Sequence, residues 1–289
     1  MGRRVGRQIM WMRFTMNNLL IVLSLWWLLL APPQALAEPA PLSIPGEITV
    51  PFRGVDHSAL RGFAQDRITH ITFHHEGFAG TDSDLFRRAS AARDRQTIDQ
   101  RVRNIHAYHA GDAGLGMFAY HYAVDKAGNI AKGRPVSLKP STRSTAIGSR
   151  NLADFAGHFA VVALGDFNHE SLTPAGRLAY VRVMSEAQRA YRVPTAQIQP
   201  HKHHAATSCP GTHILKEAGA LREMVRHYSL QAELVGRGCL KDTPDGKWGP
   251  KSRRALRAFN KANRGVVAQP EVSDVALFGM LDAPGATCR

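Results

Sequence analysis

Two short β-branched runs, separated by stretches of helical periodicity, constrain the fold of this chain most. The run "ITHITFHH" at residues 68–75 alternates apolar and polar side chains, as a half-buried strand does. The run "HFAVVALG" from His158 is continuously apolar, which is typical of a buried strand. Residues 98–109 lie between them and repeat their apolar side chains at helical spacing. The pattern predicts an α/β fold in which helices flank a mixed central β-sheet.

Further elements fit the same plan. The segment "FAYHYAVDKAGNIAKGR" predicts a hairpin, with one strand at residues 118–124, a turn at 125–129 and a short return strand. Thr173 and Pro174 are typical of the N-cap and first residue of a helix. A last helix is predicted across residues 214–228, where apolar residues again lie on one stripe.

The first 37 residues have the features of a secretory signal peptide. Four arginines precede the apolar run of residues 19–31, and small residues at 35–37 allow cleavage before Glu38. A retained membrane anchor is the alternative, but a spanning helix needs about 20 apolar residues and this run ends at Pro32. We therefore expect an exported protein, periplasmic or extracellular, that meets the membrane only through this segment if it is uncleaved.

Composition divides the rest of the chain into three parts. Residues 38–64 are rich in proline and predict an extended lead-in, residues 65–229 an enzyme-sized domain, and residues 230–289 a small helical domain. Without the four leader arginines, 33 basic residues face 23 acidic ones. This charge suits an anionic polymer, and export favours cell-wall polysaccharide over nucleic acid. The alternative is that the charge serves solubility alone.

The three cysteines suggest one disulfide and one thiol with another task. Cys239 and Cys288 lie near the two ends of the C-terminal segment and could close it. Such a bridge would contribute about 2–4 kcal/mol to a segment too short to bury much core. Cys209 is then the cysteine left over.

Cys209 lies in the stretch "HKHHAATSCPG", which begins at His201. Catalytic zinc takes three protein ligands, usually nitrogen or sulfur, and leaves a fourth position to water. The spacing of His201 and Cys209 suits a loop that folds back on itself, and a strand ending in "HH" could supply the third ligand. On spacing alone, these histidines could equally be polar surface residues.

Five blocks of the sequence carry a resemblance. The segments "ITFHHEG", "AYHYAVDKAGNIAKGR", "VVALGDFN", "TPAGRLA" and "HKHHAATSCPG" occur in an order and spacing similar to those of zinc-dependent N-acetylmuramoyl-L-alanine amidases. This family includes phage lysozyme-type amidases and peptidoglycan recognition proteins. The resemblance covers roughly residues 65 to 225. It implies an enzyme that hydrolyses the amide between N-acetylmuramic acid and L-alanine, with peptidoglycan rather than nucleic acid as its partner.

The resemblance also implies site residues. One zinc ion per chain would be held by His74, His201 and Cys209. Tyr120 matches the family's active-site tyrosine, and Thr207 matches a position where the family carries lysine or threonine. Both would act as the tetrahedral intermediate forms, by donating hydrogen bonds or by positioning water; the alternative is that they serve only in substrate binding.

Candidate cleft residues are His75, Glu76 and His121, of which His121 could line the cleft or simply pack. His75 would be a neighbour of the metal and not a ligand. Glu76 departs from the family, which usually has threonine or serine there, and it could take part of the role of a general base or remain idle in solvent. Val162 stands where some relatives have a catalytic glutamate, so a general base must come from elsewhere or not be needed.

The C-terminal segment resembles a small peptidoglycan-binding domain. Its "DGKWG" turn at residues 245–249 and "ALRAF" at residues 255–259 match that domain's short motif. The basic residues around this motif could meet stem-peptide carboxylates or form one solvated helix face.

Three rival functions follow from the same residues. One is a non-catalytic recognition module, which in the family typically lacks the cysteine ligand. Another is a zinc peptidase that cuts within the stem peptide. The last is a cysteine hydrolase in which Cys209 pairs with a neighbouring histidine.

Overall fold

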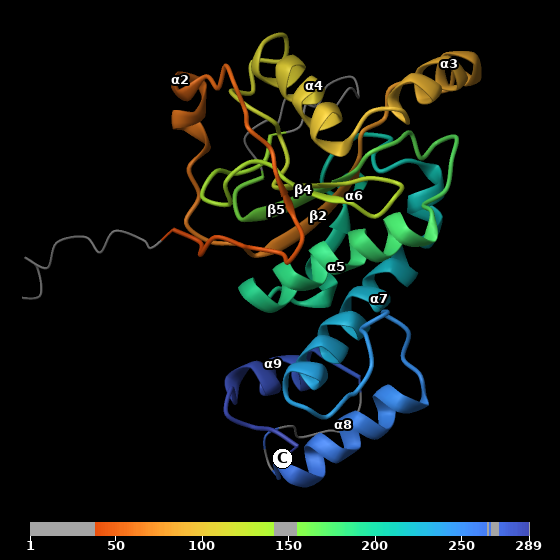
Figure 1. Cartoon of the computed structure of the whole chain (residues 1–289). Coiled ribbons are helices and arrows are strands. Elements are labelled where there is room, and N and C mark those ends of the chain that lie inside the picture. Colours follow the sequence, from red (N-terminus) through yellow and green to blue (C-terminus); the bar gives the residue numbers. More distant parts are fainter. Residues whose placement is uncertain (1–37, 142–154, 265, 267–271, 289) are drawn as a thin grey trace, which may run out of the picture. The chain divides into compact units, whose positions relative to one another are not determined.

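The computed structural model describes residues 38–141, 155–264, 266 and 272–288 (Figure 1). The predicted signal peptide lies outside these residues, and residues 38–289 belong to one compact unit. Among the helices described, none is both long enough and apolar enough to span a membrane.

The centre of the molecule is the mixed β-sheet that the sequence predicts. Its strand order is β1-β4-β3-β5-β2-β6, and every neighbouring pair is parallel except the β3–β4 hairpin. The strands are β1 (Ile48–Thr49), β2 (His70–His75), β3 (Tyr122–Val124), β4 (Ile130–Lys132), β5 (His158–Ala163) and β6 (Ile198–Pro200).

Helices cover both faces of this sheet, which confirms the predicted fold class. They are α2 (His57–Leu60), α3 (Ser83–Arg93), α4 (Ile98–Ala110), α5 (Pro174–Tyr191), α6 (His201–His204), α7 (Thr212–Gly236), α8 (Pro250–Ala262) and α9 (Asp274–Asp282). Thr173 caps α5 by accepting a hydrogen bond from the Gly176 backbone, as its position before a proline predicts. Two short 3-10 turns, Arg61–Phe63 and Thr195–Gln197, complete the described elements.

Successive side chains of β2 point to opposite faces of the sheet. Ile71 and Phe73 belong to the core shared with α5 and α7. Helix α4 covers the other face of the sheet (Figure 1). Thr72 and His74 point to that face, where Ile98 and Val102 of α4 are buried. His74 is thereby placed on the α4 side of the sheet.

The predicted lead-in is more structured than its composition indicates. It supplies the edge strand β1, which pairs in parallel with β4. Tyr122 donates a hydrogen bond from its hydroxyl to the Leu42 carbonyl, and Lys132 Nζ contacts both Leu42 and Glu47. A strand of two residues leaves no periodic signal, so the sequence could not reveal it.

The predicted strand at residues 118–124 is shorter in the structure, where β3 begins at Tyr122. The residues before it are held differently, because the guanidinium of Arg134 donates to the carbonyls of Leu115, Met117 and Phe118. Arg134 is almost fully buried and thus fixes the segment that leads to Tyr120.

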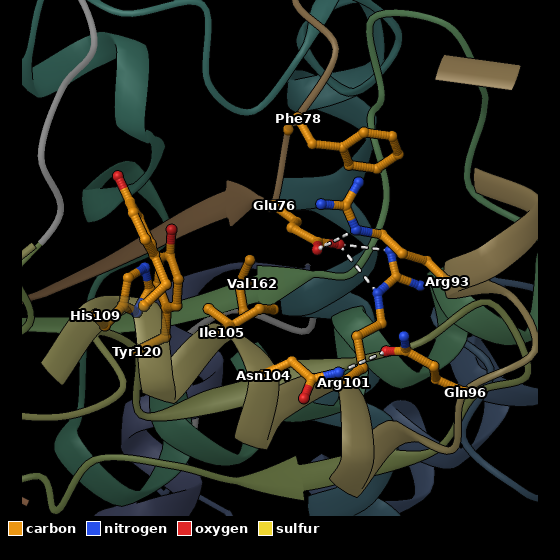
Figure 2. A pocket seen from close by; sticks show the side chains of 12 residues that line it. Glu76, Phe78, Arg93, Gln96, Arg101, Asn104, Ile105, His109, Tyr120 and Val162 are labelled. Carbon is orange, nitrogen blue, oxygen red and sulfur yellow. Dashed lines mark hydrogen bonds and ion pairs between the residues drawn. The ribbon is translucent and has the colours of Figure 1, made fainter. Parts of the chain in front are cut away.

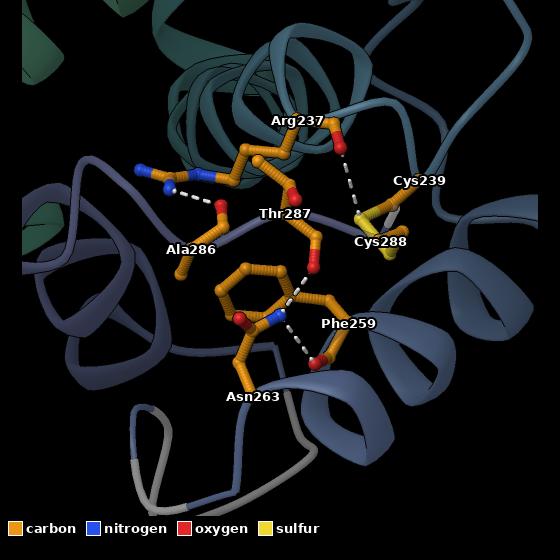
Figure 3. Close-up of a disulfide and its surroundings, with 7 residues drawn as sticks. All are labelled: Arg237, Cys239, Phe259, Asn263, Ala286, Thr287 and Cys288. Carbon is orange, nitrogen blue, oxygen red and sulfur yellow. Dashed lines mark hydrogen bonds between the residues drawn. A yellow bond between two sulfur atoms is a disulfide. The ribbon is translucent and has the colours of Figure 1, made fainter.

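Helix α7 continues to Gly236 and so passes without a break through residue 230, where composition suggests a boundary. Its last turns carry Leu230 and Leu234 into a separate small core with α8 and α9. Cys239 and Cys288 are joined in a disulfide at this core, with their Cα atoms 5.2 Å apart (Figure 3). The division into two domains stays a prediction.

Candidate metal centre

The pairing of β2 with β6 brings the first two candidate ligands together. The strands are parallel, and Phe73 lies opposite Pro200. The next residues along the chain are His74 in β2 and His201 at the start of α6, and they therefore meet at the carboxyl edge of the sheet, with ring centroids 4.6 Å apart.

The loop that follows α6 folds back and brings Cys209 to the edge of the sheet where His74 and His201 meet. The Lys202 backbone N–H donates to the Cys209 carbonyl at 2.9 Å, and the Cys209 N–H donates to the Thr207 hydroxyl. Gly211 then opens α7 with a φ of 89°, where a side chain would approach the carbonyl carbon of Phe167 to 2.5 Å. The sulfur of Cys209 lies 3.6 Å from His74 Nδ1.

One potential ligand atom from each of His74, His201 and Cys209 lies within 4.8 Å of the others. Burial lowers the pKa of His74 well below its ordinary range and that of His201 to about 4, so both imidazoles are neutral, the form that binds metals. Burial raises the pKa of the Cys209 thiol to about 12, so a thiolate here needs a cation beside it. His74 Nε2 is buried without a hydrogen-bond partner among the described residues. This donor set and its burial fit a zinc ion.

Tyr120 and Thr207 line the same cavity as His201 and Cys209, and the volume of this cavity is about 340 Å³. The ring of Tyr120 lies 5.0 Å from that of His74. Burial, with the charges of Cys209 and Glu76, raises the pKa of the Tyr120 phenol far above its ordinary range, so the phenol keeps its proton as a donor. The Thr207 oxygen accepts the Cys209 N–H at 3.2 Å, which leaves its own proton for another acceptor.

The three candidate cleft residues have different environments. His75 lines the cavity but faces away from His74, and its Nδ1 accepts the Phe167 N–H at 3.1 Å. His121 is fully buried, with Nδ1 accepting from Ala160 and Nε2 donating to Leu138. His121 therefore packs inside the fold and does not line the cleft.

Glu76 is not the solvated residue that its place after a strand suggests. Its side chain is only 9% exposed and pairs with Arg101 and Arg93. Arg101 Nε donates to Glu76 Oε2 at 3.1 Å. Both carboxylate oxygens of Glu76 thus face a guanidinium group, which leaves neither free to approach a water molecule and disfavours Glu76 as a general base.

A second, adjoining cavity of about 600 Å³ shares Glu76, Phe78 and Tyr120 with the first (Figure 2). His109 of α4 lies on its aromatic wall, with its ring 6.0 Å from that of Tyr120. Its Nδ1 accepts the Ala119 N–H, and burial lowers its pKa to about 4, so it is neutral with its proton on Nε2. The helical spacing of residues 98–109 places His109 on the stripe that faces the sheet, and that spacing was the available signal for it.

Comparisons with family models and with curated proteins find no match for this chain. Among solved structures, it is similar to the endolysin N-acetylmuramoyl-L-alanine amidase LysCS from Clostridium intestinale URNW, with 20% identity, a TM-score of 0.43, and coverage of 62% of this chain and 95% of that one. It is also similar to the Ph2119 endolysin from a Thermus scotoductus bacteriophage (20% identity, TM-score 0.40, coverage 57% and 90%). Drosophila PGRP-LB is similar at 15% identity and a TM-score of 0.40, with coverage of 55% and 83%. These scores are too low to carry an argument about function, which rests on the residues themselves.

Proposed function

We propose that this protein is a zinc-dependent N-acetylmuramoyl-L-alanine amidase that acts on peptidoglycan. The observation that carries the proposal is the convergence of ligand atoms of His74, His201 and Cys209 to within 4.8 Å, beside a cavity that His201, Cys209 and Tyr120 line. Three such ligands leave a fourth position open, as hydrolysis requires.

The amide bond in question is uncharged and unreactive. Zinc bound at these ligands would polarise the substrate carbonyl and acidify a water molecule. Tyr120 donates a hydrogen bond from its protonated phenol to the oxygen that becomes negative, and Thr207 can donate to the same oxygen or hold the attacking water. Glu76 takes no part as a base, because Arg101 and Arg93 hold its carboxylate.

The rival functions are weaker on this evidence. A recognition module does not need all three metal ligands, whereas in this structure Cys209 lies beside both His74 and His201. A cysteine hydrolase needs an accessible thiolate, whereas burial raises the pKa of Cys209 to about 12. A zinc peptidase would use the same ligands, so only its products separate it from an amidase.

The other assignments belong to the same proposal. We assign export to residues 1–37, on their basic and apolar pattern. We assign peptidoglycan binding to residues 230–289, on the "DGKWG" turn and the helix that follows it.

The test is digestion of purified sacculi followed by mass spectrometry of the products. An amidase releases free glycan and intact stem peptide, a peptidase shortens the peptide, and a binding module leaves the material unchanged. His74→Ala and Cys209→Ala should both lose zinc and hydrolysis. His203→Ala, which removes an exposed histidine of the same stretch, is the matched control and should retain both. Normal turnover by a metal-free Cys209→Ala variant would refute the proposal.

A further inference from the structure

The cavity next to the candidate metal centre has two chemically different walls (Figure 2). Tyr108, His109 and Tyr120 form an aromatic wall, and Ile105 and Val162 lie between the walls. The opposite wall is charged and consists of Glu76, Arg93 and Arg101. Because Tyr120 and Glu76 also line the cavity of the metal ligands, a bound molecule can extend from one cavity into the other.

Arg101 has its donors occupied. Its Nε and Nη2 both contact Glu76, and its Nη1 lies 3.8 Å from Asp94. Asp94 in turn pairs with Lys126 at 2.9 Å. Arg101 is 6% exposed, so it serves as a buried support for Glu76.

Arg93 has donors to spare. Within the described chain its one acidic partner is Glu76, whose Oε1 lies 3.4 Å from Arg93 Nε. Its guanidinium carbon lies over the Phe78 ring, 3.7 Å from the ring centroid, a cation–π contact that fixes the side chain there. Among the described residues, its Nη1 is buried without a hydrogen-bond partner, whereas the side chain as a whole remains 32% exposed. Lys126 also contacts Glu170, so the three cations Arg93, Arg101 and Lys126 are matched by three carboxylates. Arg93 is the most exposed cation of this network.

We infer that Arg93 binds a carboxylate of the substrate's stem peptide, and that Glu76 and Arg101 position Arg93 for it. This inference rests on the proposed function, because it takes the substrate to be a muramoyl peptide. On that substrate the sugar next to the scissile amide is uncharged, whereas the peptide carries free carboxylates. The stem peptide then lies along the cavity of Arg93, with its carboxylate on the guanidinium wall.

The test compares two soluble muramoyl peptides that differ only at the residue after L-alanine, which carries either free or amidated carboxyl groups. The wild type should prefer the free form by roughly 10- to 100-fold in kcat/KM, mostly through KM, as expected for a hydrogen bond to a charged group. Arg93→Gln should reduce this preference to nearly one. Arg93→Lys, which keeps the charge but loses the planar fork, should give an intermediate preference.

Two controls make the outcome specific. Arg88→Gln removes an exposed arginine of the same helix α3 and should retain the wild-type preference. Calorimetric titration with the free acidic dipeptide, L-alanyl-D-glutamate, measures binding without hydrolysis and should show a loss of at least roughly tenfold in affinity for Arg93→Gln.

The results separate this inference from the proposed function. If the protein binds the acidic dipeptide through Arg93 but hydrolyses no muramoyl peptide, the proposed amidase activity is contradicted and the inference about Arg93 stands. Hydrolysis by the wild type with equal kcat/KM for the free and the amidated peptide would overturn the inference alone. A preference for the free peptide that survives in Arg93→Gln and Arg93→Lys would overturn it as well.

Discussion

At the scale of single residues, adjacent positions in this chain have opposite roles. Tyr120 points its ring toward His74, whereas His121 is fully buried and uses both ring nitrogens on backbone partners. Motif resemblance nominates Tyr120, but it leaves His121 undecided because its burial depends on the neighbouring strand β5. Likewise, the sequence shows that Glu76 is a carboxylate near the site, but not that Arg101, 25 positions away, already holds it.

The role of Tyr120 leads to a prediction. Tyr120→Phe should retain zinc and the fold, because the phenol makes no hydrogen bond that the described structure needs. Its kcat should fall by about 10²–10³-fold, the usual effect of removing one oxyanion donor, with a small change in KM. Steady-state kinetics on a soluble muramoyl peptide measures this. An unchanged kcat in a zinc-loaded variant would remove Tyr120 from the chemistry.

At the scale of elements, long periodic segments are predictable and short or aperiodic ones are not. The sequence predicts β2, α4, α5 and α7, where an apolar stripe or alternation extends over several turns or residues. Helix α3 is not predicted because none of its residues is buried, and β1 is not predicted because it is only two residues long. Helix α9 is apolar all round and so lacks a clear stripe.

The C-terminal helices lead to a prediction about stability. Their core is small, and the Cys239–Cys288 bridge ties Cys239, three residues beyond the end of α7, to the tail across 49 positions. Replacing both cysteines by alanine should lower the free energy of unfolding by about 2–4 kcal/mol, measured by denaturant titration of the zinc-loaded protein. Hydrolysis of a small soluble substrate should persist, because Cys209 is untouched. A loss below about 0.5 kcal/mol would show that α8 and α9 are held by packing alone.

At the scale of the whole molecule, the candidate site depends on strand pairing that no local pattern contains. His74 and His201 are 127 positions apart, and they meet because β2 and β6 are parallel neighbours with Phe73 opposite Pro200. The sequence shows which histidine and cysteine residues could bind zinc, and the family resemblance selects His74, His201 and Cys209 among them. The convergence itself, and the cavity that Arg93 lines, arise only once the sheet is assembled.

The most direct test of this account is the zinc content of the purified, folded protein, measured by plasma mass spectrometry. We predict about one zinc ion per chain in the wild type and in the His203→Ala control, and almost none in Cys209→Ala. Removal of the metal by a chelator should abolish release of free glycan, and added zinc should restore it. Full hydrolysis by zinc-free wild-type protein, or undiminished zinc in Cys209→Ala, would contradict the account.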